Sequence, residues 1–189
     1  HWAFTAIKKP VIPSVSETEW IKNPIDSFIL NGLGEEGFVH SKEADKYTLI
    51  RRASFDLTGL PPTQAAIKAF LDDTSPEAYE KMLDRFLVSE KFGEHRARYW
   101  LDAARYSDTH GFHLDNYRSI WPYRDWVVKA YNDNMPFDQF TIEQIAGDML
   151  PNSTQSQKIA TGFNRCNPTT SEGGAIAEEY FSIYAKDRV

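Results

Sequence analysis

The sequence predicts an all-α fold of about eight to nine helices, arranged as an orthogonal or irregular bundle with an extended N-terminal arm. Three observations predict it. Apolar residues recur at three- and four-residue spacing along most of the chain, no alternating strand pattern exceeds about four residues, and 14 % of the residues are aromatic. These rings can fill a core without disulfides, and the single cysteine, Cys166, has no partner within the chain.

Residues 1–22 predict the extended arm, because Pro10 and Pro13 interrupt them and no helical period runs through them. Three aromatic rings are expected to pin this arm to the body: Trp2, Phe4 and Trp20. Residues 23–189 predict a single helical domain. Because His1 is not a natural start, the chain is expected to be a processed or excised piece of a larger protein.

Caps and breakers set the expected helix boundaries. Asn23-Pro24 is typical of a helix start, and the run from Thr58 through Gly59 to Pro62 is a strong helix stop. Helices are expected over residues 44–57, 91–107, 123–134 and 175–189, with shorter ones after Asn23, Thr63, Ser75, Pro136 and Thr154.

Two polar segments, Asp108–Pro122 and Asn164–Gly174, interrupt the helical pattern. A loop of this length inside a compact domain is usually functional or held in place by other groups. Any shared site therefore requires that the two segments lie side by side when the helices pack.

The first polar segment carries residue types that bind borderline metals: Asp108, His110, His113 and Asp115. They predict a divalent ion, zinc or calcium. The spacing matches no known zinc signature, and Gly111 stands at the wrong position for a calcium loop. The alternative is that the aspartate turns the chain and the imidazoles are solvated.

Acidic residues of both segments could instead form a general acid and base pair: Asp108, Asp115, Glu172 and Glu178. Such a pair would suit a hydrolase or lyase acting on a polysaccharide. The structural alternative is that acids in the first turns of a helix simply stabilise that helix. A third group, Trp121, Tyr123 and Arg124, could bind a sugar substrate by stacking and charge, or could belong to the core.

Several classes of function are disfavoured. The net charge of −6, without a basic stripe, makes a nucleic-acid partner unexpected. No apolar run is long enough to span a bilayer, and no phosphate loop, nucleophile elbow, dinucleotide fingerprint or haem-attachment motif is present in the chain.

Nine short stretches, in order, resemble the planctomycete cytochrome-c-associated domain of unknown function. The resemblance covers essentially the whole chain. The stretches are HWAF (1–4), NPIDSFI (23–29), LIRR (49–52), DLTGLPPT (56–63), YWLD (99–102), YRDW (123–126), AGD (146–148), EGGAI (172–176) and DRV (187–189).

The resemblance implies an exported, multidomain protein that is periplasmic or secreted. Its partners would be a c-type cytochrome domain and a downstream domain of the same polypeptide. It implies haem c as the cofactor, with the attachment motif following residues 187–189, outside this chain. Three residues would then face the cofactor: His95, His110 and Arg165.

The function implied is that of a helical module supporting haem, redox or electron-transfer chemistry. Two alternatives stay open: the polysaccharide hydrolase or lyase above, and a non-catalytic scaffold that binds carbohydrate or metal. No reaction follows from the resemblance itself.

Overall fold

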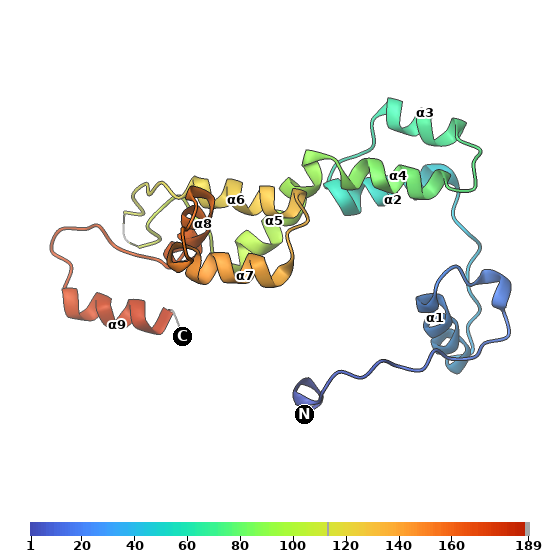
Figure 1. The fold of residues 1–189 in the computed structure, drawn as a ribbon, viewed down its shortest axis with the longest axis horizontal. Coiled ribbons are helices and arrows are strands. Elements are labelled where there is room, and N and C mark those ends of the chain that lie inside the picture. The colour runs from blue at the N-terminus through green and yellow to red at the C-terminus, as the bar shows by residue number, and fades with distance from the viewer. Residues whose placement is uncertain (113, 188–189) are drawn as a thin grey trace. The chain divides into compact units, whose positions relative to one another are not determined.

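The computed structural model describes residues 1–112 and 114–187, and this part of the chain contains nine α-helices and no β-strand (Figure 1). The all-α prediction is confirmed. The chain folds as two compact units, one from His1 to Ala44 and one from Asp45 onward. The division falls later than the boundary at residue 22 that the sequence predicts.

The first unit contains two short 3-10 helices, η1 (Trp2–Phe4) and η2 (Thr18–Trp20), and α1 (Pro24–Glu35). A capping box begins α1: the Asn23 side chain accepts from the Ile25 amide, and Asp26 accepts from the Asn23 amide. Of the three rings expected to pin the arm, Trp20 stacks on His40 within this unit with centroids 4.8 Å apart, Phe4 is exposed, and the side chain of Trp2 lies outside the described part.

The second unit begins with α2 (Lys46–Thr58), α3 (Gln64–Asp72) and α4 (Ala78–Leu87), which pack together in Figure 1. Asp45 and Thr63 cap the starts of α2 and α3 through their side-chain oxygens. Gly59, with φ of 70°, ends α2 in the left-handed region. Their buried core consists of Ile50, Ala53, Phe70, Ala78 and Met82.

The larger core lies between α5 (Glu90–Ala103), α6 (Trp121–Asn132), α7 (Phe137–Ala146) and α8 (Gln155–Ala160), with η3 (Gly147–Met149) and η4 (Thr161–Arg165) beside them. Trp100 Nε1 donates to the side-chain oxygens of Gln144, at 2.8 Å, and Tyr123, at 3.0 Å. The Tyr123 hydroxyl donates to Gln144 Oε1 at 2.6 Å. This buried network satisfies its polar groups and fixes how the three helices meet.

Close backbone approach sets the distance between α5 and α6. A Cβ on Gly93 would lie 2.4 Å from the Val128 carbonyl oxygen, so only glycine fits there. The Gly93 amide donates to Asn132 Oδ1 at 2.7 Å. This contact holds the two helices whose connection, residues 104–120, contains most of the first polar segment.

The last helix, α9 (Ala177–Asp187), follows the second polar segment. None of the helices in the ranges that the structure describes has both the length and the apolar character needed to cross a membrane.

Candidate functional site

The two polar segments lie side by side, as a shared site requires. The Thr169 amide donates to the His110 carbonyl oxygen at 2.7 Å, and Gly111 and Thr169 form a parallel β-bridge. The side chains of His110 and Thr169, 59 residues apart, share a second hydrogen bond of 2.7 Å. Asn116 Nδ2 donates to Ser171 Oγ at 3.3 Å. We call residues 108–117 and 164–174 the joined loops.

Arg118, which directly follows the first of the joined loops, also binds the second. Its Nη1 donates to the Asn167 carbonyl oxygen at 3.0 Å and to Thr169 Oγ1 at 3.2 Å. Only 9 % of its surface is exposed. Sequence reasoning missed this residue, although it is the single arginine of the first polar segment and lies shortly before the buried Ile120 that precedes α6.

Asp108 is held in a structural role. Its carboxylate accepts from the Tyr106 hydroxyl at 2.6 Å and from the Ile120 amide at 3.0 Å, where α6 begins. Partial burial raises the pKa of this carboxyl, but the hydrogen bonds from Tyr106 and Ile120 lower it more, so the pKa falls below its usual value. Asp108 is therefore ionised, with both oxygens engaged.

The expected metal ligands are not assembled in the part of the chain that the structure describes. Asp115 is exposed and accepts from the Gly111 amide at 2.7 Å, while His110 is engaged with Thr169. His113 lies outside the described residues. Among residues 1–112 and 114–187, no three His, Cys, Asp or Glu side chains lie close enough together to hold a metal ion.

The four acidic residues expected to supply a general acid and base have different environments. Glu172 and Glu178 are exposed, and Asp108 and Asp115 are bonded within the first loop. None of the four lines the cavity of the joined loops. The geometry therefore gives no specific support to carboxylate catalysis.

The aromatic substrate group is divided between surface and core. Tyr123 is only 1 % exposed, so a sugar does not reach it, and the core alternative holds for this residue. Trp121 is exposed at the start of α6, and exposed Arg124 pairs with Asp125 at 2.9 Å. The three residues are close in sequence, but they lie on different sides of α6, so Tyr123 faces the core while Trp121 and Arg124 face outward. Residue type alone does not show this difference.

A cavity of about 390 Å³, lined by residues with polar side chains, opens between the joined loops. Its lining combines two guanidinium groups, an imidazole, two amides and a hydroxyl: Arg118, Arg165, His110, Asn164, Asn167 and Thr169. His110 and Arg165, both expected to face a cofactor, are thus brought together. A neighbouring cavity of about 400 Å³ shares Asn164 and Asn167 and contains Cys166, whose pKa burial raises to about 11.

His95, the third residue expected to face a cofactor, lies elsewhere. It is buried between α5 and α2, and a Cβ on Gly59 would lie 2.4 Å from its Nδ1. Burial, followed by the charges of Arg98 and Arg96, lowers the pKa of its imidazole. The ring is a neutral packing element in this position.

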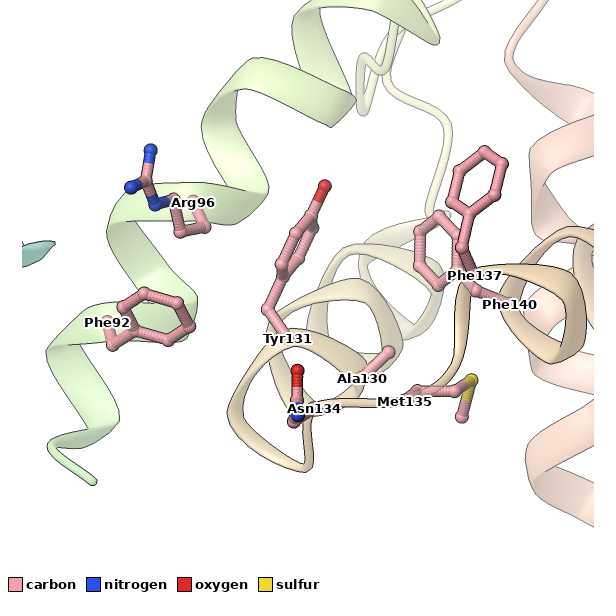
Figure 2. A pocket seen from close by; sticks show the side chains of 8 residues that line it. All are labelled: Phe92, Arg96, Ala130, Tyr131, Asn134, Met135, Phe137 and Phe140. Atoms are coloured by element: carbon pink, nitrogen blue, oxygen red, sulfur yellow. The ribbon is translucent and has the colours of Figure 1, made fainter. Parts of the chain in front are cut away.

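An apolar pocket of about 310 Å³ lies between α5, α6 and α7, as Figure 2 shows. Its lining consists of Phe92, Arg96, Ala130, Tyr131, Asn134, Met135, Phe137 and Phe140. A haem site needs an axial ligand such as an imidazole within an apolar cleft. No histidine lines this pocket, and His95 lines neither it nor the cavity that contains His110 and Arg165, so the three residues expected to face the cofactor are not gathered in one haem site.

The comparisons with known proteins assign a family. The model of PSCyt2, described as a protein of unknown function (DUF1549), matches residues 24–189. Neither the curated proteins nor the solved structures gave a match. The family is the planctomycete cytochrome-associated domain that the sequence resembles. The match covers both polar segments and every helix from α1 to α9, and the chain therefore belongs to the PSCyt2 family.

Proposed function

We propose that this chain is a helical support module of an exported protein that contains a c-type cytochrome, acting outside the cytoplasm. The joined loops would form the surface on which the haem-bearing part of the same polypeptide docks. Since His95 lies apart from His110 and Arg165, the role proposed is to position and cover that part, which affects electron transfer indirectly.

The main support for this proposal is a pair of exposed apolar side chains on a loop that hydrogen bonds hold in place. Leu114 and Tyr117 are 76 % and 72 % exposed in the first of the joined loops. The loop beneath them is held by the bonds from His110 and Arg118 to the second loop. Exposed apolar groups on a fixed backbone are typical of an interaction surface.

The last helix extends this surface. The Tyr184 hydroxyl accepts from the Thr170 amide at 2.8 Å, and the rings of Phe112 and Tyr180 meet edge to face at 5.9 Å. Phe181 on the same helix is exposed. Both joined loops therefore contact α9, and we call the surface of these three segments the joined-loop face.

The test uses the full-length haem-loaded protein. A double variant, Leu114→Ser with Tyr117→Ser, removes apolar contact area, and Val88→Ser at the end of α4 removes an equally exposed apolar side chain elsewhere. Docking predicts that the double variant lowers the midpoint potential, because greater access of water favours the more highly charged oxidised iron. Val88→Ser should leave it unchanged. Equal potentials for both variants and the parent protein would refute the proposal.

A further inference from the structure

Arg118 is a buried cation without a carboxylate partner. None of the ion pairs among residues 1–112 and 114–187 includes it. Its Nε is buried and has no hydrogen-bond partner. An unsatisfied buried donor costs about 1–3 kcal/mol, and more when it is charged. Such a group in a native fold calls for an explanation.

The carboxylate of Asp108 does not provide one. Asp108 contributes a favourable charge interaction with Arg118, but a smaller one than the effects of burial, Cys166 and Arg165. Both oxygens of Asp108 already accept from Tyr106 and Ile120. The Nε donor of the guanidinium therefore stays unused, and Arg118 also lines the cavity.

The arrangement of Arg118 is suited to a planar or tetrahedral anion. Nη1 is fixed by the Asn167 carbonyl and the Thr169 hydroxyl, so the guanidinium plane is held in place. No hydrogen bond within the described ranges uses the Nε edge of the group. A guanidinium that is already held loses little entropy when it binds an oxyanion.

The rest of the cavity is also rich in donors. Arg165 lines the cavity and is exposed. The pKa of Arg118 is lowered mainly by its own burial, and the positive charge of Arg165 lowers it further. None of the six lining residues carries a carboxylate. Within a chain of net charge −6, this cavity concentrates two guanidinium groups, and an anion placed between them would relieve their repulsion.

We propose that the cavity lined by Arg118 and Arg165 is a binding site for an oxyanion group, carried by a small ligand as a carboxylate, phosphate or sulfate. Arg118 is the principal donor, Arg165 supplies a second charge, and Asn164, Asn167 and Thr169 surround the group with polar atoms. The volume of about 390 Å³ is in the range of small-molecule sites. This site does not depend on the docking proposed above.

Isothermal titration calorimetry on the whole chain tests the proposal, with inorganic phosphate, sulfate and glucuronate as probes and uncharged glucose for comparison. We expect saturable binding of at least one oxyanion and none of glucose. The relative affinities of the tetrahedral anions and the carboxylate then identify which chemistry the site prefers. Absence of saturable binding for all three anions would overturn the proposal.

Matched arginine variants locate the site. Arg165→Gln should weaken binding by at least about tenfold, and Arg118→Gln should abolish it. Arg85→Gln, in the last turn of α4, removes an equally exposed charge elsewhere and should change nothing. If Arg118→Gln fails to fold, Arg165→Gln decides alone, because its side chain has no hydrogen bond within the described part. If Arg165→Gln and Arg85→Gln weaken anion binding equally, the effect reflects the overall charge of the chain, and the proposed site is refuted.

Discussion

His110 and Thr169 are joined twice, once through the main chain and once through their side chains, across 59 residues of sequence. The same threonine hydroxyl also accepts from Arg118 Nη1 at 3.2 Å. One side chain thus serves both the imidazole and the guanidinium. Through it, two loop segments far apart in the sequence are held together as one structural element.

Thr169→Val is expected to loosen the joined loops. The substitution keeps the shape but removes the partner of His110 and one acceptor of Arg118, which should lower the free energy of unfolding by about 1–3 kcal/mol. Chemical denaturation measures the change. Thr74→Val, at an exposed position between α3 and α4, should shift it by less than about 0.5 kcal/mol. Similar shifts for both variants would show that the threonine does not join the loops.

Gly59→Ala should destabilise the packing of α2 against α5. Any side chain there adopts a left-handed backbone, and its Cβ would lie 2.4 Å from His95 Nδ1. Gly174→Ala has the same backbone problem with open space around it, and should cost about 1–2 kcal/mol. Gly59→Ala should cost about 1–3 kcal/mol more than that.

A double variant isolates the contact with His95. Gly59→Ala combined with His95→Ala removes the ring that the new methyl group would strike, so the two losses should not add. Denaturation of the single and double variants gives the coupling energy. Simple additivity would show that the ring and the glycine do not meet.

His95 should make stability depend on pH in mildly acidic solution. Its pKa is lowered in the folded state, mainly by burial, from the ordinary value of 6.5. As the pH falls, the unfolded chain therefore binds a proton at this histidine before the folded chain does. The contribution of His95 to the free energy of unfolding is complete above pH 6.5 and is lost as the pH falls towards the folded pKa. His95→Gln should lose less stability than the parent protein between about pH 7.5 and about pH 5 in denaturation at both values. Parallel losses would contradict a neutral buried imidazole.

Asp108→Ala should uncouple the start of α6 from the first of the joined loops. The Tyr106 hydroxyl and the Ile120 amide lose their acceptor, at an expected cost of about 1–3 kcal/mol. Since the pKa of Asp108 lies below 3.8 when folded, its contribution is present above that pH and disappears in stronger acid. The difference between variant and parent, measured by denaturation, should therefore shrink at low pH. Asp84→Ala on the exposed face of α4 should show neither effect.

The helical class and most helix starts could be predicted from sequence, because caps and breakers act locally. Asn23, Asp45 and Thr63 begin helices through bonds to amides two or three residues away. The end of α5 could not. The sequence extends this helix to residue 107, but it ends at Ala103, and Arg105 adopts a φ of 57° that turns the chain into the first joined loop.

The site itself was only partly predictable. Polarity and length identify both loops from the sequence, and in the structure His110 and Arg165 line one cavity between them. The sequence does not identify Arg118, because its partners Asn167 and Thr169 are 49 and 51 residues away. Residue spacing within a short segment cannot predict a hydrogen bond over that separation. Residue type does not reveal burial, so the sequence places His95 at a cofactor and leaves Tyr123 open between substrate and core, whereas both are buried inside the helical unit.

Hydrogen–deuterium exchange most directly tests whether the joined-loop face is the docking surface. Amides of residues 108–112 and 164–174 would be compared in the full-length haem-loaded protein and in this chain alone, with α4 as an internal reference. Docking predicts slower exchange at both loops in the full-length protein and no change in α4. Unchanged exchange at the loops would contradict the account.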